Sequence, residues 1–275
     1  MFTRREPKIA EQELAHIPGA EPQSRIDVWW WLVALIVGLV VILCVTKPDP
    51  YWNILKFVRD GIKITIFITI VSFVFVLIIG MLGGLGRLSK NKVIYLISTL
   101  YVELVRGIPL LVQLIWWYFA FPVVIKQIGE WTHIALLENY QANAIFLAIV
   151  GFVACYGAYM SEIYRAGIQS IPKGQMEAAR SLGMSYFQSM RHVVLPQAIR
   201  VILPPVGNEF ISLLKDSSLV SAVALADLTR RGREFMATHF NPIEVWSMVA
   251  LLYLVMTLFS ARIVTWIERR TKFER

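Results

Sequence analysis

Residues 175–198 read QMEAARSLGMSYFQSMRHVVLPQA, a mostly polar stretch between two strongly apolar ones. Its small side chains let another protein surface approach a helix closely. Gly183 is a natural helix stop, because a helix C-terminus often needs a residue that tolerates the left-handed conformation. Ser185 followed by Gln188 has the spacing of a capping box, which starts a second helix, and Pro196 disturbs the continuation of that helix. The stretch therefore predicts a helix, a sharp turn and a second helix just outside a membrane.

Composition places the rest of the chain in a membrane. Of its 275 residues, 57% are hydrophobic, and the mean hydropathy is +0.59, whereas soluble domains are about 45–50% apolar. Several apolar runs reach the ~20 residues that cross a bilayer. The net charge of +8 would suit nucleic acid, but the basic residues gather beside the apolar runs. This distribution is typical of a membrane protein and argues against nucleic-acid binding.

We expect an all-α integral membrane protein with about six transmembrane helices. The expected spans are residues 28–45, 61–85, 93–121, 142–160, 199–225 and 245–267. The stretch 93–121 is longer than one bilayer needs at ~1.5 Å per residue, so we expect a kink or break near Gly107 and Pro109. Pro204 and Pro205 should break the fifth span. Polar loops are expected at residues 46–60, 122–141 and 226–242, and the first of them has room for a short surface helix.

The chain divides into three parts. Residues 1–27 carry charges, three prolines and no apolar period, which predicts a flexible cytoplasmic tail. Residues 28–60 hold an N-terminal transmembrane helix and its loop. Residues 61–275 hold the other five spans, and the loop at 165–200 contains the polar stretch quoted above.

Lys and Arg residues predict the orientation. With the N-terminus in the cytoplasm, the cytoplasmic segments hold 17 of these residues and the outer segments hold 8, which fits the positive-inside rule. Both termini and the 165–200 loop then lie in the cytoplasm, where ATP is. A cluster of Arg230, Arg231 and Arg233 lies outside. It is either part of a solvated loop or a docking patch for an acidic partner.

One spaced motif of the loop carries a family resemblance. Its members are Glu177, Ala178, Ala179, Gly183, Leu195 and Pro196. The motif resembles the EAA loop of ABC importer permeases, with Val193 where that family usually has Ile. In the family this loop forms a coupling helix that sits in a groove of the ATP-binding subunit. An ordinary amphipathic hairpin is the alternative, but the full pattern in a loop between spans favours coupling.

Polar residues interrupt two of the expected spans, where a charge near the bilayer centre costs at least ~2.5 kcal/mol. In the third span, Glu103 and Arg106 lie three apart and can pair, and Gln113 follows. The stretch ELVRGIPLLVQL, which begins at Glu103, resembles the polar amino-acid subfamily of ABC permeases. It is either an ion pair that stabilises a kink or a pore lining that binds zwitterionic ligands.

The fifth span carries a second polar set. The stretch NEFISLLKDSSL, which begins at Asn208, also resembles that subfamily. Asn208, Glu209 and Ser212 fall within about one helical turn and can face a common cavity. Lys215 and Asp216 lie further along, at the outer rim. For Lys215 an interfacial anchor is the favoured interpretation, because its side chain can snorkel. All five residues are candidates for the substrate path.

The resemblance covers roughly residues 61–275 and implies the MetI-like fold of a type I ABC importer permease in a bacterial inner membrane. It also implies a second permease chain, identical or related, two ATP-binding subunits and an extracytoplasmic amino-acid-binding protein, with lipid around the spans. The stretch YMSEIYRAGIQSI is typical of the same subfamily, and its Glu162 and Arg165 are expected to support the coupling loop. The first span departs from the five-span pattern of the subfamily.

The chain carries no catalytic signature of its own. It has no G-x-x-x-x-G-K-[ST] phosphate loop, and its four histidines lack metal-ligand spacing. We therefore expect a permease that is not an enzyme, binds no cofactor and relies on ATP and Mg²⁺ bound by partner subunits. The alternatives are a self-contained channel or secondary carrier, which has no need of a docking loop, and a sensor that kept the permease fold.

Overall fold

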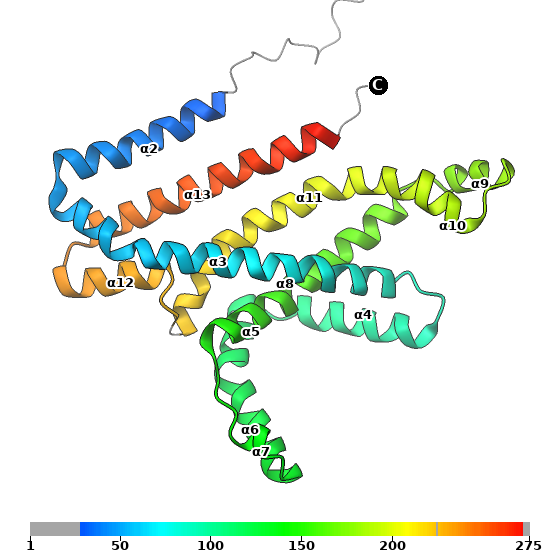
Figure 1. Ribbon diagram of the computed structural model, residues 1–275, viewed down its shortest axis with the longest axis horizontal. Coiled ribbons are helices and arrows are strands. Elements are labelled where there is room, and N and C mark those ends of the chain that lie inside the picture. The colour runs from blue at the N-terminus through cyan, green and yellow to red at the C-terminus, as the bar shows by residue number, and fades with distance from the viewer. Residues whose placement is uncertain (1–27, 224, 272–275) are drawn as a thin grey trace, which may run out of the picture.

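Helices make up the described part of the protein, which covers residues 28–223 and 225–271 of the computed structural model (Figure 1). The expected tail at residues 1–27 lies outside the described residues. In chain order the elements are α2 (Val28–Thr46), α3 (Pro48–Gly86), α4 (Lys92–Arg106), α5 (Leu110–Ile115), the π-helical turn η1 (Trp116–Ala120), α6 (Phe121–Thr132), α7 (Ala135–Glu138), α8 (Ala144–Gln169), α9 (Lys173–Ser181), α10 (Tyr186–Ser189), the π-helical turn η2 (Met190–Val194), α11 (Leu195–Asp216), the 3₁₀ turn η3 (Ser217–Val223), α12 (Leu228–His239) and α13 (Pro242–Thr271). The all-α prediction is confirmed.

Within these residues, five helical segments are long and apolar enough to cross a membrane: α2, α3, the continuous run from α5 to α6, α8 and α13. The fifth expected span, residues 199–225, corresponds to α11. Its 22 residues make it about 33 Å long at ~1.5 Å per residue, which suffices for the ~30 Å hydrocarbon core. Arg200, Glu209, Lys215 and Asp216 make α11 more polar than the other five. α11 is therefore long enough to cross the bilayer, but it is more polar than the five segments named above.

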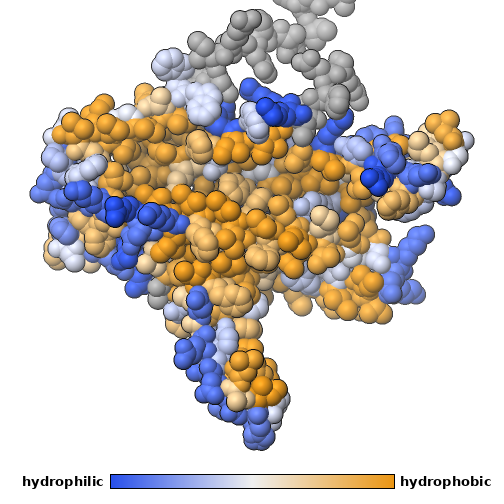
Figure 2. All heavy atoms as spheres, in the orientation of Figure 1, coloured by the Kyte–Doolittle hydropathy of each residue, from blue (hydrophilic) through white to orange (hydrophobic). Residues whose placement is uncertain are grey.

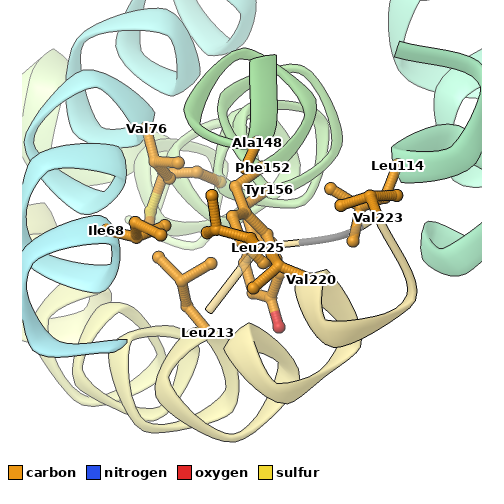
Figure 3. Packing of buried hydrophobic residues seen from close by; sticks show 11 residues of the cluster. Ile68, Val76, Leu114, Ala148, Phe152, Tyr156, Leu213, Val220, Val223 and Leu225 are labelled. Carbon is orange, nitrogen blue, oxygen red and sulfur yellow. The ribbon is translucent and has the colours of Figure 1, made fainter. Parts of the chain in front are cut away.

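The centre of the bundle is the crossing of α3 with α8. A Cβ atom added at Gly83 of α3 would lie 2.1 Å from the Oγ atom of Ser161 on α8. The two helices approach this closely because glycine has no side chain, which is how membrane helices commonly associate. Beside the crossing, a buried apolar cluster joins α3, α5, α8, α11 and η3 (Figure 3), and it includes Ile68, Phe152 and Val220.

The expected loop at residues 46–60 is wrong, because α3 begins at Pro48 and continues through residue 60. Proline is tolerated in the first turn of a helix. Ile54 and Val58 are fully buried in an apolar cluster shared with α2, α12 and α13. Tertiary packing therefore extends a helix that the polar composition of this stretch does not predict.

Two further expected loops also contain helices. The stretch 122–141 holds most of α6 and all of α7, and the stretch 226–242 holds α12. Leu228 and Phe235 of α12 are buried, so one apolar face is enough to fix a helix that is polar overall. In Figure 1, α6 and α7 project away from the bundle, and α6 packs against α7 and η1.

The expected break in the fifth span is also wrong, because α11 continues through Pro204 and Pro205. A proline removes one backbone hydrogen bond and usually kinks a helix. Membrane helices tolerate it because neighbouring groups and local changes of helical pitch accommodate the freed carbonyl groups. The α-helix ends instead at Asp216, where the tighter turn η3 begins.

The bundle has two distinct ends (Figure 1). At the hairpin end, α8 and α11 lead into α9 and α10. At the α12 end, α12 lies against α3 and α13. Both the start of α2 and the finish of α13 point toward the hairpin end. Figure 2 shows hydrophilic residues gathered at both ends, with a broad apolar surface between them. This distribution is expected of a protein that crosses a bilayer along the bundle axis.

Candidate functional site

A helical hairpin forms the hairpin end, as the sequence predicts. α9 finishes in a Schellman motif, in which the Met184 N–H donates to the carbonyl of Ala179 (3.2 Å) and the Gly183 N–H donates to that of Arg180 (3.0 Å). Gly183 has a φ of 84°, a left-handed conformation that favours glycine. These bonds reverse the chain direction within one turn.

A capping box starts α10. The Gln188 N–H donates to Ser185 Oγ (3.3 Å), and the Ser185 N–H donates to Gln188 Oε1 (2.8 Å). The helix then widens into η2, where the Leu195 N–H donates to the carbonyl of Met190. Pro196 follows and has no N–H to donate. The expected disturbance at this proline is therefore a widened turn, and the helix continues into α11.

The outward surface of the hairpin is small and apolar. Ala179 is buried where α9 packs on α10 and η2. Leu182 is 82% exposed and Phe187 is 71% exposed. Apolar side chains grouped this way at a polar end of the molecule are typical of a surface that binds another protein. We define the docking face as the exposed residues Glu177, Ala178, Leu182, Tyr186 and Phe187.

The break between α4 and α5 lies just before Pro109, as predicted, whereas the apolar run continues beyond it into α6. Gln113 is 7% exposed. Its Nε2 donates to the carbonyls of Val105 and Ile108, both at 2.8 Å, and contacts Cys155 Sγ at 3.5 Å. One amide thus satisfies two carbonyl groups at the break. Gln113 supports the bend and does not line the surface of a path.

A charge network joins α3, α4 and α8 on the side of the hairpin end. Arg87, which directly follows α3, pairs with Glu103 of α4 (3.2 Å) and with Glu162 of α8 (2.8 Å). Glu162 also pairs with Arg165, one turn further along α8. These four residues, which we call the charge network, fix the first half of the interrupted span against the helix that leads into the hairpin.

Arg106 does not form the expected ion pair with Glu103, because Glu103 is held by Arg87. The Arg106 guanidinium lies 5.1 Å from the ring centroid of Tyr159 on α8, which is a cation–π distance. Arg106 therefore lies beside the space that α5, α8 and α11 enclose.

A cavity of about 190 Å³ lies in that space. Its lining residues are Leu110, Cys155, Tyr156, Tyr159, Glu209 and Asp216. The Tyr156 hydroxyl donates to Asp216 Oδ2 at 2.7 Å. Carboxylates at membrane depth are costly and usually mark a substrate or ion pathway. We call this space the polar cavity, and it is the candidate substrate site.

A polar stripe runs along the open side of α11. Asn208 and Lys215 are exposed, and Ser212 is half-buried. Spacings of four and three residues put these side chains on one helical face. Such groups are unfavourable against lipid tails. The stripe therefore faces protein or a water-filled space.

Side chains tie α12 to the bundle at the other end. Arg231 pairs with Asp60 of α3 (2.6 Å) and with Glu234 (2.8 Å), and Arg230 pairs with Glu234 (3.1 Å). Burial alone would raise the pKa of Glu234, but the hydrogen bonds and charges of Arg231 and Arg230 outweigh it and hold this pKa below its usual value. The arginine cluster is thus largely engaged within the chain, which favours a structural role over a docking patch.

Asp227 caps α12 from a fully buried position. It accepts hydrogen bonds from the N–H groups of Thr229 (3.0 Å) and Arg230 (2.9 Å) and from the hydroxyl of Tyr253 on α13 (3.3 Å). Burial raises the pKa of Asp227 above its ordinary value, although these hydrogen bonds oppose the shift. The cap and the Arg231 pairs together hold α12 against α3 and α13.

One protein family, described as "Binding-protein-dependent transport system inner membrane component", matches residues 76–273 of the chain. The chain belongs to this family. Together with the helical bundle, this membership confirms the expectation of a transport permease in a membrane.

Curated relatives of this permease are amino-acid transport proteins. It is 34% identical over 221 residues to the glutamine transport system permease protein GlnP of Escherichia coli (strain K12). The alignment covers 80% of this chain and 95% of the relative. It is 37% identical over 240 residues to the L-cystine transport system permease protein TcyB of Bacillus subtilis (strain 168), covering 87% and 95%. It is 34% identical over 244 residues to the arginine transport system permease protein ArgU of Corynebacterium glutamicum, covering 83% and 75%.

Solved structures place the permease in the same fold. The crystal structure of an amino acid ABC transporter with histidines aligns with a TM-score of 0.70 and 35% identity, over 83% of this chain and 98% of that one. An inward-facing structure of the MetNI methionine ABC transporter aligns with a TM-score of 0.65, over 80% and 99%, at 22% identity. The second likeness shows the fold alone. The expected MetI-like fold is confirmed, and no observation favours the channel or secondary carrier.

The permease brings together part of the expected substrate path. Glu209 and Asp216 line the polar cavity, and Arg106 lies beside it. The three residues of the polar stripe share another face of α11. Gln113 and Glu103 are instead bonded to other groups of the chain. Among the described residues, no group of three or more His, Cys, Asp or Glu side chains is placed to hold a metal ion.

Sequence reasoning missed the contribution of α8 to the cavity. Cys155, Tyr156 and Tyr159 all line it, and their spacing puts them on adjacent positions of one helical face. In the sequence they read as apolar residues of the fourth span. The pairing of Tyr156 with Asp216, 60 residues away, is a tertiary contact with no local signal.

Proposed function

We propose that the chain is one of two permease subunits of an ATP-driven importer of polar amino acids. The observation that carries the proposal is the docking face, a self-closed hairpin that presents Leu182 and Phe187 beyond the end of a membrane bundle. In a binding-protein-dependent transport protein, an ATP-binding subunit is the partner that such a surface fits. Relatives named for glutamine, L-cystine and arginine transport support the substrate class.

The proposed orientation puts the hairpin and both chain ends in the cytoplasm of a bacterial cell, with the α12 end outside the inner membrane. The distribution of Lys and Arg supports it. ATP and Mg²⁺ would then be bound by two partner subunits at the hairpin, and an extracytoplasmic amino-acid-binding protein would deliver substrate at the α12 end. This chain supplies the connection between the two ends.

The proposed path runs between α5, α8 and α11 and is closed on its open side by a second permease chain, identical or related. The polar stripe supports this arrangement, because Asn208 and Lys215 are exposed on α11 and lipid tails would not solvate them. A second chain placed there gives the stripe a polar neighbour and turns the side of the bundle into the wall of a channel.

In the proposed mechanism, closure of the ATP-binding subunits displaces the hairpin as a rigid unit. α11 continues from η2 without interruption, and three residues join α8 to α9, so both helices carry the displacement to the polar cavity. The Gln113 amide holds the α4–α5 break at a fixed angle, and the charge network links α4 to α8. Transport then alternates between two packed arrangements of these helices, both biased by nucleotide and by substrate.

Reconstitution tests the proposal. The chain is copurified with its ATP-binding subunits and second permease chain, inserted into proteoliposomes with the binding protein, and assayed for uptake of a panel of radiolabelled amino acids. We expect uptake that requires both ATP and the ATP-binding subunits. Uptake by the chain alone would establish a channel or carrier, and ATP hydrolysis without uptake of any amino acid would contradict the importer.

A further inference from the structure

The charges around the polar cavity do not balance. Glu209 and Asp216 line it, and none of the described lining residues is positively charged. Arg106 supplies one positive charge beside it, because its guanidinium lies over the ring of Tyr159, which lines the cavity. Two carboxylates and one guanidinium leave the site with a net charge of −1.

The other charged groups nearby do not remove this imbalance. The charge network contains two arginines and two glutamates, so it is neutral as a unit, and it lies nearer the hairpin end. Lys215 precedes Asp216 in α11, but it belongs to the exposed polar stripe and is absent from the cavity lining. The negative charge therefore belongs to the cavity itself.

The net charge separates two classes of amino acid. A neutral amino acid is a zwitterion, so its ammonium and carboxylate cancel and the cavity keeps its charge of −1. A basic amino acid carries one further positive charge and makes the occupied site neutral. Because an uncompensated charge at membrane depth is unfavourable, the cavity binds the basic class more tightly.

The lining also suits a cationic side chain. Tyr159 already holds one guanidinium against its ring at 5.1 Å, and tyrosine rings attract such cations. The Tyr156 hydroxyl donates to Asp216 at 2.7 Å, which fixes the direction of that carboxylate. At about 190 Å³, the cavity is smaller than the ~300–1,000 Å³ sites of drug-sized ligands. Its size suits a small solute such as one amino acid.

We propose that the polar cavity selects basic amino acids, holding the side-chain cation between Glu209 and Asp216 while the α-carboxylate lies toward Arg106. This inference rests on the proposed function, because it assigns a substrate class to the path of an amino-acid importer. It assigns part of the selectivity to the permease itself, in addition to any selection by a binding protein.

Direct binding tests the inference. The solubilised complex of permease chains and ATP-binding subunits, without the binding protein, is titrated with radiolabelled arginine, lysine, glutamine and glutamate. We expect arginine and lysine to bind at least about tenfold more tightly than glutamine, and glutamate to bind most weakly. Glu209→Gln should weaken arginine binding by about 30-fold, the scale expected when one partner of a buried charge pair is lost, and glutamine binding by less than about threefold.

Glu130→Gln is the matched control, because Glu130 is exposed on α6, away from the cavity, and its loss should leave both affinities unchanged. If Glu209→Gln fails to copurify with the ATP-binding subunits, Asp216→Asn replaces it. The ratio of arginine to glutamine affinity in the unmodified complex tests the inference in either case. Glutamine bound as tightly as arginine, or arginine binding insensitive to these substitutions, would overturn the substrate class and leave the importer standing. A complex that neither binds nor takes up any amino acid would contradict the proposed function itself.

Discussion

The two ends of the bundle are built in opposite ways. The hairpin end closes through its own backbone, with a turn at Gly183 and a capping box, and it leaves Leu182 and Phe187 exposed. The α12 end is held by side chains, among them Arg231 on Asp60. An element whose backbone hydrogen bonds are formed within itself keeps its side chains available for a partner. In an element that is held by its side chains, those side chains are already engaged within the chain. The hairpin thus keeps an exposed apolar surface, whereas α12 is fixed on the bundle.

The largest effect is expected from charging the docking face. Phe187→Asp places a carboxylate on an apolar side chain that is 71% exposed, and the desolvated centre of an interface does not tolerate it. We expect binding of the ATP-binding subunit to fall by about 30-fold or more, the scale of an interface hot spot. Copurification and surface plasmon resonance measure the loss.

Phe240→Asp is the matched control at the α12 end, where Phe240 is 83% exposed. It should leave binding of the ATP-binding subunit unchanged. Equal losses in the two variants would remove the distinction between the ends.

The next largest effect is expected at the turn. Gly183→Val forces a β-branched residue into a φ of 84°, which costs about 1–3 kcal/mol. The turn should open and displace α10, so ATP hydrolysis continues while uptake per ATP falls severalfold. The ratio of uptake to hydrolysis in proteoliposomes measures this uncoupling.

Gly174→Ala serves as the control, since a Cβ atom at Gly174 meets nothing within 4 Å and the position has no positive φ. It should keep the normal ratio. A normal ratio in Gly183→Val as well would mean that the shape of the turn does not transmit the displacement.

A smaller effect is expected at the α12 end. Arg231→Ala removes pairs with Asp60 and Glu234, all of them partly exposed, so we expect a loss of about 1 kcal/mol or less. The melting temperature of the solubilised complex should fall by a few degrees, with unchanged binding of the ATP-binding subunit. Lys126→Ala, at an exposed position of α6, should do neither. Weakened subunit binding in Arg231→Ala would contradict a purely local role.

The smallest effect is expected from pH. The pKa of Glu234 lies below its ordinary value of 4.5. A carboxyl group with a lowered pKa stabilises the folded state above its ordinary pKa and loses that contribution as pH falls through the folded-state pKa. The stability difference between the unmodified protein and Glu234→Gln should therefore shrink below about pH 4.5, by less than ~1 kcal/mol because the pair is partly exposed. Asp227 is present in both proteins, so its contribution to the pH dependence of stability cancels in the difference. A difference that grows with acid would refute the assignment.

What the sequence predicts well is what short-range chemistry decides. Gly183 stops a helix and Ser185 with Gln188 starts one, whatever surrounds them, so the hairpin is predictable. Pro204 and Pro205 are the opposite case. Whether a proline breaks a membrane helix depends on neighbouring groups whose positions the sequence does not reveal. The sequence predicts at both prolines a break like the one that precedes Pro109.

The candidate site follows the same division. Glu209 and Asp216 stand out in the sequence because charges are rare in membrane spans. The positions of Gln113 and Tyr156 depend on contacts across 42 and 60 residues, so no local pattern distinguishes an amide that supports a bend from one that lines a path. The sequence predicts a loop where α12 lies, because the apolar face of α12 can be recognised only once α3 and α13 are in place.

α3 takes part in both ends. It contributes Asp60 to the pairs that hold α12, and Arg87, which directly follows its last residue, belongs to the charge network. These two residues are 27 positions apart, or about 40 Å at ~1.5 Å per residue. A continuous helix neither shortens nor stretches, so a tilt that shifts one of these contacts also shifts the other. The two faces of the membrane are therefore not interchangeable modules. A chimera that takes its hairpin end from one permease and its α12 end from another would have to inherit α3 whole, together with the residues that contact the two ends of α3.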